Sequence, residues 1–102
     1  MIHVVAVITS HPDQRGNILA VAKDNVEVVR AEDGCLEYSV VVDTEFGAFQ
    51  TKFGEDTFLV IEKWRDEDAL RAHAAAPHMI TYSRTVKDWI ASRVIHVLDS
   101  AY

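Results

Sequence analysis

Strand-like and helix-like segments follow one another along the chain in an order that few folds can accommodate. The strand-like segments are apolar and rich in β-branched residues, and they cover residues 2–10, 35–43, 57–65 and 92–99. Helix-like periodicity covers about residues 13–33, 66–76 and 77–90, so the predicted order is βαββααβ. One direct connection between two strands, with helices elsewhere, is typical of a ferredoxin-like α+β sandwich with an antiparallel sheet.

The predicted helices have recognisable faces and ends. Gly34 is expected to end the first helix, because glycine adopts the left-handed conformation without a steric penalty. Asp66 is a suitable N-cap for the second helix, and Pro77 suits the first turn of a third. The apolar positions expected to face the core from the first helix are Leu19, Ala22, Val26 and Val29.

The first two strands are apolar at nearly every position, which predicts that both of their faces are buried. Helices would cover one face of the sheet, and a second copy of the chain would cover the other. The sequence therefore predicts a homodimer. With 102 residues, the chain is too short for two independent cores, so residues 1–102 are expected to form a single domain.

The charge and the apolar patterning exclude several classes of partner. The net charge of -6 opposes binding to nucleic acid and to anionic lipid, because no cluster of Lys and Arg offsets it. No apolar stretch approaches the roughly 20 residues of a membrane-spanning helix, and no leader pattern is present, so we expect a cytoplasmic protein. The single cysteine, Cys35, is interpreted as a small buried residue, with a catalytic nucleophile as the alternative.

The connection between the second and third strands is longer than a tight turn and carries Phe46, Phe49 and Phe53. Aromatic side chains are costly to expose in a solvated loop. We therefore expect this segment, residues 44–56, to be a flap that packs on a pocket or on a partner subunit.

Glu62 is the first candidate for a chemical role. Because side chains alternate along a strand, it shares a face with Phe58, Val60 and Trp64. A carboxylate in such an apolar row must be paired, hydrogen-bonded or raised in pKa, as a general base or a substrate anchor would be. The alternative is a glutamate at a strand end that reaches solvent or forms an ion pair.

His73 is the second candidate, because its spacing from Leu70 and Ala74 places it on the apolar side of its helix. A neutral imidazole in an apolar cleft can transfer a proton near neutral pH, whereas a core histidine bonded to a backbone carbonyl is the alternative. His78 and Tyr82 lie one turn apart on the next helix, where they line a pocket or complete the core. The histidines lack a compact partner carboxylate or cysteine, and no glycine-rich phosphate loop is present, so neither a metal nor another cofactor is expected.

These residues carry a family resemblance. The strand end Glu62-Lys63-Trp64, followed by Ala69-Leu70, His73, Pro77-His78-Met79 and Tyr82, resembles the antibiotic-biosynthesis monooxygenase domain, in particular its quinol monooxygenase branch. The Gly34-Cys35 junction and the aromatic flap fall where that branch has them, so the resemblance covers essentially the whole chain.

The resemblance implies a homodimer whose sheets pack into a dimeric α/β barrel, with a pocket in each subunit between sheet and helices. It also implies oxidation of a small hydrophobic aromatic quinol or phenol by O2, without metal or flavin. On this basis His73 is the expected base, with Glu62 or Tyr82 in support. The expected substrate-binding residues are Trp64, His78, Met79, Phe58 and Val60.

Other relatives leave alternatives open. Haem-degrading members use a first-strand asparagine, a tryptophan where this chain has His73, and a haem-ligating histidine near Ser83, so haem degradation is not expected here. An isomerase of a phosphorylated sugar shares the histidine motifs, although basic residues are scarce around them in this chain. A small-molecule-binding dimer without catalysis is the third alternative.

Overall fold

The computed structural model describes residues 1–102 and has the predicted order of elements. The elements are β1 (Ile2–Ser10), α1 (Arg15–Arg30), β2 (Cys35–Val41), β3 (Thr57–Trp64), α2 (Glu67–Ala74), α3 (Pro77–Val86), the 3₁₀ turn η1 (Lys87–Trp89) and β4 (Ile90–Asp99). The strands pair antiparallel in the order β2-β3-β1-β4. The predicted ferredoxin-like α+β fold is confirmed, except that α3 ends at Val86 and η1 replaces its last predicted turn.

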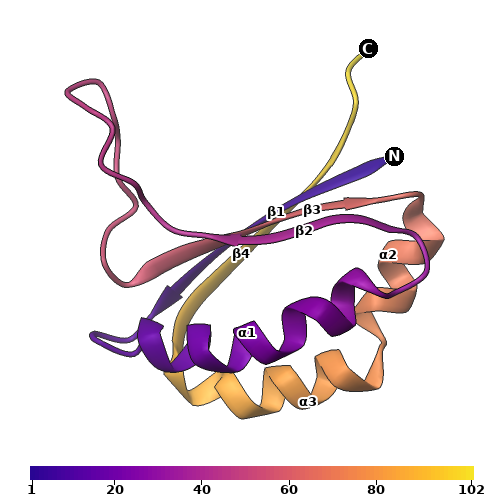
Figure 1. Ribbon diagram of the computed structural model, residues 1–102, viewed down its shortest axis with the longest axis horizontal. Coiled ribbons are helices and arrows are strands. Elements are labelled where there is room, and N and C mark those ends of the chain that lie inside the picture. Colours follow the sequence, from indigo (N-terminus) through magenta and orange to yellow (C-terminus); the bar gives the residue numbers. More distant parts are fainter.

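The helices lie on one side of the sheet (Figure 1). α1 and α3 pack against each other under this face, while α2 lies at one end of the sheet. Asp66 caps α2 as predicted by accepting a hydrogen bond from the backbone N–H of Ala69 at 2.8 Å, and Pro77 stands in the first turn of α3. None of the helices is both long and apolar enough to cross a bilayer.

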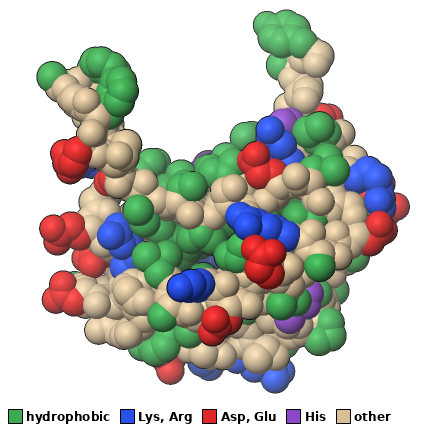
Figure 2. Space-filling view, in the orientation of Figure 1, with side chains coloured by type: hydrophobic (Ala, Val, Ile, Leu, Met, Phe, Trp, Pro, Cys, Tyr) green, Lys and Arg blue, Asp and Glu red, His purple; other side chains and the backbone are tan.

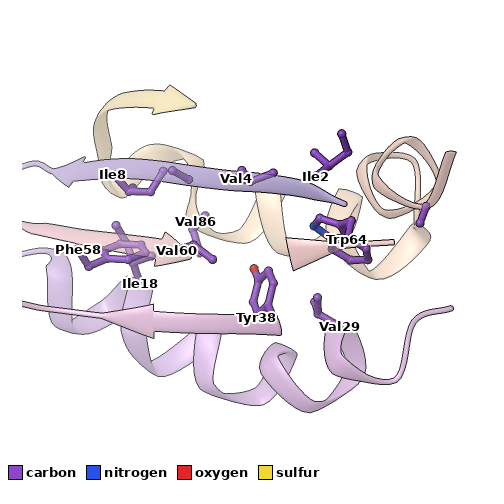
Figure 3. Close-up of a cluster of buried hydrophobic side chains, with 12 residues drawn as sticks. Ile2, Val4, Ile8, Ile18, Val29, Tyr38, Phe58, Val60, Trp64 and Val86 are labelled. Carbon is purple, nitrogen blue, oxygen red and sulfur yellow. The ribbon is translucent and has the colours of Figure 1, made fainter. Parts of the chain in front are cut away.

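The hydrophobic core lies between the sheet and α1 and α3. At one end Phe58 packs near Ile18, and at the other Trp64 lies near Val29 (Figure 3); all four side chains are fully buried. Burial of each such side chain stabilises the fold by about 1.5–3 kcal/mol. The predicted α1 stripe is correct for Ala22 and Val29, whereas Leu19 and Val26 are only partly buried and Ile18 is fully buried instead. Neighbouring side chains on a helix point about 100° apart, so a modest rotation of the helix changes which of them faces the sheet.

The outer face of the sheet is open in the single chain. In the single chain the burial of β1 alternates residue by residue, so burial of both faces of β1 and β2 requires a second subunit and stays a prediction. Outward-facing residues of β1 and β3 are half-buried, and those of the edge strand β4 are more exposed, with Val94 at 49% and Leu98 at 48%. An apolar surface thus covers this side.

Gly34 forms the turn that leads from α1 into β2. Contrary to the prediction, Gly34 does not end the helix, because α1 stops at Arg30 and Ala31 caps it. Gly34 has a φ of 84°, and a Cβ atom there would lie 2.6 Å from the Cβ of Ala69. Only glycine allows this conformation and this close approach. The turn matters for the site, because it carries Glu32 towards α2.

The segment between β2 and β3 projects from the open side of the sheet, as does the C-terminus (Figure 1). Phe46 and Phe49 stack edge to face, with ring centroids 5.3 Å apart, yet Phe49 is 84% exposed. The three phenylalanines of this segment do not line the cavity of their own chain. The pocket-covering flap is therefore not observed, and packing on a partner subunit stays a prediction.

Candidate functional site

A cavity of about 550 Å³ lies between the inner face of the sheet and the helices α2 and α3. Its lining is mostly apolar, and its volume is in the range of small-molecule sites. Figure 2 shows an apolar hollow between sheet and helices, with basic side chains at its rim. Ile95 and Val97 of β4 line the cavity but are about half exposed, so the cavity opens along this edge strand.

Glu62 lies in the cavity wall and is only 7% exposed. The indole N–H of Trp64 donates to its Oε1 at 2.9 Å, and His73 Nε2 lies 3.9 Å from the same oxygen. Burial raises the pKa of Glu62, whereas the bond from Trp64 and the proximity of His73 oppose this shift. The alternative of a solvent-reaching glutamate is excluded, because the carboxyl group is buried beside one donor and one imidazole.

Glu32 joins two histidines from different helices. Its Oε2 lies 2.7 Å from His73 Nδ1 and 3.0 Å from His78 Nε2. An ionised carboxylate only accepts, so each histidine donates from the nitrogen that faces Glu32. In neutral His73 this assigns the proton to Nδ1 and leaves a lone pair on Nε2, which faces Glu62. The alternative of a backbone carbonyl as partner of His73 is wrong, since the partner is this side chain.

Sequence spacing gave no sign of Glu32, which lies in the turn after α1 and far from either histidine along the chain. In the folded protein a carboxylate does accompany the histidines, contrary to the expectation from their spacing. Glu32, His73 and His78 each offer a ligand atom, and these atoms lie within 4.8 Å of one another. Two imidazoles and a carboxylate are zinc-type ligands, although the hydrogen bonds between them already occupy these atoms. The absence of a metal stays a prediction.

Aromatic side chains hold His73 in place. The ring of Trp64 lies 4.6 Å from the imidazole, and the ring of Tyr38 lies 5.8 Å away in an edge-on arrangement. Burial, and next the nearby charge of Glu62, raises the pKa of Tyr38. Burial also raises the pKa of Tyr82, which lines the cavity from α3. Both phenols therefore stay protonated at neutral pH and can donate hydrogen bonds to a ligand.

Most of the residues predicted for the site meet in the cavity. Those that line it are His73, Glu62, Tyr82, Met79, Phe58 and Val60. Trp64 and His78 do not: Trp64 is fully buried at the end of β3, where it contacts Glu62 and His73, and His78 bonds to Glu32 outside the lining. Both can act on a ligand only through their neighbours.

Residues 1–85 match the family model described as antibiotic biosynthesis monooxygenase. The chain belongs to this family. YcnE of Bacillus subtilis (strain 168), which is provisionally named a monooxygenase, is 33% identical over 78 residues, covering 76% of this chain and 74% of YcnE. Rv0793 of Mycobacterium tuberculosis (strain H37Rv), with a similarly provisional name, is 28% identical over 102 residues, covering 96% of this chain and 92% of the relative.

Solved structures of other proteins share this fold. The structure of Rv0793 superposes with a TM-score of 0.79 at 25% identity, over 99% of this chain and 98% of the other. A mutant of SnoaB of Streptomyces nogalater, described as a cofactor-independent oxygenase, gives a TM-score of 0.78 at 13% identity, covering 99% and 93%. At that identity the likeness to SnoaB is one of fold alone.

Proposed function

We propose that this family member is a cofactor-independent monooxygenase that oxidises a small aromatic quinol or phenol with O2. The observation that carries the proposal is the position of His73. Its Nδ1 is held by Glu32, and its Nε2 faces a buried carboxyl group at the wall of a mostly apolar cavity. A base fixed in this way needs only a bound acidic hydroxyl to act on.

The reaction can be balanced without a further reductant. His73 Nε2 takes the proton of the substrate hydroxyl, and the resulting anion is electron-rich enough to give an electron to O2. In the net reaction the substrate loses two hydrogen atoms and gains one oxygen atom, while the second oxygen atom leaves as water. The substrate thus supplies all the electrons, and the protein binds it, orients it and moves the proton.

Two neighbours support His73 in this role. Glu32 stabilises the imidazolium that forms when Nε2 is protonated, because its carboxylate accepts from Nδ1. Glu62, whose pKa is raised by burial, and Tyr82 are placed to bind the substrate's oxygen atoms within the cavity. The apolar lining excludes water and suits a flat aromatic ring.

We further propose that two copies pack their sheets together in a dimeric barrel. The outer face of the sheet supports this, since its central residues Val5, Val7, Leu59 and Ile61 are apolar. The projecting aromatic segment and the C-terminus border this face (Figure 1), so both can contact a second subunit that packs on it. Burial of such a surface is the main source of stability in obligate dimers.

Oxygen uptake tests the proposed reaction. The rate with 1,4-dihydroxynaphthalene is compared for the wild type, His73→Ala and the matched control His11→Ala, whose exposed side chain is outside the cavity. Loss of a positioned base lowers the rate by roughly 10²- to 10⁴-fold. His11→Ala should keep the wild-type rate. A panel of quinols oxidised no faster by the wild type than by buffer, or full activity of His73→Ala, would refute the proposal.

An isomerase or another proton-transfer enzyme is a second candidate, and one observation favours it. Along the sequence, basic residues are scarce near the histidine motifs, and this scarcity disfavours a phosphorylated substrate. The fold, however, brings Lys87 and Arg93 into the cavity lining. Exchange of a substrate C–H proton with solvent, with no consumption of O2, would support this function instead.

A further inference from the structure

Two exposed cationic side chains stand at the rim of the cavity, and the proposed reaction does not use them. Lys87 comes from η1 and Arg93 from the inner face of β4. Neither belongs to any ion pair of the chain. Most other basic side chains are on the surface beside carboxylates, as Arg65 is beside Asp33. Two cations without counter-ions at an apolar cavity favour a negatively charged ligand.

The strand register places Arg93 away from the acid–base cluster, and Lys87 lies in η1, which leads into Ile90 opposite Ser10 at the same end of β1. Glu62 pairs with Val4 of β1, whereas Arg93 pairs with Ile8 of the same strand. Four residues of strand correspond to roughly 13 Å at about 3.3 Å per residue. All four residues face the helices, because they occupy alternate positions of the same face. The cavity therefore has a proton-transfer end and a cationic end.

The wall between the two ends is suited to an aromatic ring system. Ala6, Val60 and Ile95 lie between them on the sheet, and Met79 and Tyr82 face them from α3. Tyr82 of α3 and Arg93 of β4 both line the cavity; burial raises the pKa of Tyr82, and the charge of Arg93 opposes that shift. A phenol and a guanidinium that line the same cavity are both donors that can bind an anionic group.

We propose that the ligand of this cavity is a flat apolar molecule that carries an anionic group, held by Arg93 and Lys87, at the end remote from its reacting hydroxyl. The anionic group is a carboxylate or a phosphate ester, which share this recognition chemistry. The assignment of a reacting hydroxyl rests on the proposed function, whereas the assignment of an anion site does not. Binding without turnover can therefore test it separately.

Unreactive fluorescent probes provide the test. Anthracene-2-carboxylate, its neutral carboxamide and anthracen-2-yl phosphate are titrated into the wild-type protein, Arg93→Gln, Lys87→Gln and the control Arg84→Gln. Arg84 is an exposed cation of α3 that does not line the cavity. We expect at least one anion to bind the wild type about tenfold or more tighter than the amide, a ratio that corresponds to ~1.4 kcal/mol.

The variants show which residues cause the preference for the anion over the amide. In Arg93→Gln, and less strongly in Lys87→Gln, the anion-to-amide ratio should fall towards one while the amide affinity is unchanged, and added salt should reduce the wild-type ratio. Arg84→Gln should behave as the wild type. A wild-type protein that binds neither anion more tightly than the amide would overturn the proposal, and so would a ratio that survives in Arg93→Gln. Failure of oxygen uptake alone would refute only the proposed reaction.

Discussion

Replacing Glu32 with alanine tests whether the carboxylate shared by two histidines holds the site together. His73 has a side chain that is 7% exposed, so its Nδ1–H would be left buried without an acceptor. That loss costs about 1–3 kcal/mol. His78 is 28% exposed, and water can partly replace its lost bond, so we add only about 0.5–1 kcal/mol for it. The expected destabilisation by Glu32→Ala is about 1.5–4 kcal/mol.

The assay is urea unfolding at pH 7 and one fixed protein concentration, because the stability of an oligomer depends on concentration. Glu27→Ala is the matched control, since Glu27 belongs to α1 and forms an exposed ion pair with Arg30. Its loss should cost about 0.5 kcal/mol or less. Glu32→Gln should be intermediate, because an amide oxygen can accept from both histidines but without the charge.

A double-mutant cycle with His78→Ala separates the two bonds. We expect Glu32→Ala to cost less in the His78→Ala background, because the bond to His78 is already absent there. If Glu32→Ala were no more destabilising than Glu27→Ala, the shared carboxylate would not stabilise the fold, and the assigned tautomer of His73 would lose its physical basis.

Three further outcomes follow from the structure. Burial raises the pKa of Glu62 above 4.5, so the folded protein retains a proton that the unfolded chain releases, and stability falls as pH rises through the folded pKa. Glu62→Gln should therefore be more stable than the wild type at neutral pH in thermal unfolding, and the gain should disappear below the unfolded pKa; a gain that is constant with pH would contradict the assignment. Ile61→Glu, on the outer face, should lower the mass measured by sedimentation from twice the chain mass to the chain mass. Ile80→Glu, at an exposed position of α3, should leave that mass unchanged. A monomeric wild type would disprove the dimer. Gly34→Ala should cost more than about 2 kcal/mol in urea unfolding, from its positive φ and its contact with α2. Gly47→Ala, where a Cβ meets nothing, should be nearly neutral, and equal costs for the two variants would contradict the role of strain at Gly34.

Local patterns predicted what each element does by itself. The alternation in β3 placed Glu62 on the buried face with Phe58 and Val60, and the structure has all three in the cavity wall. Asp66 and Pro77 likewise marked the starts of α2 and α3, because capping and proline geometry depend only on neighbouring residues. Trp64 obeys the same alternation but lies beyond the cavity, since periodicity gives the face and not the distance along the strand that a cavity reaches.

The sequence by itself thus determined the order of elements, the buried face of β3 and the presence of His73 and Glu62 on buried sides. Only the tertiary structure joined Glu32 to His73 and His78, and only the strand register placed Arg93 at the opposite end of the cavity from Glu62. The reason is physical. A side chain's direction follows from local backbone geometry, whereas its partners depend on how separate elements pack, and no spacing along one chain encodes the distance between them.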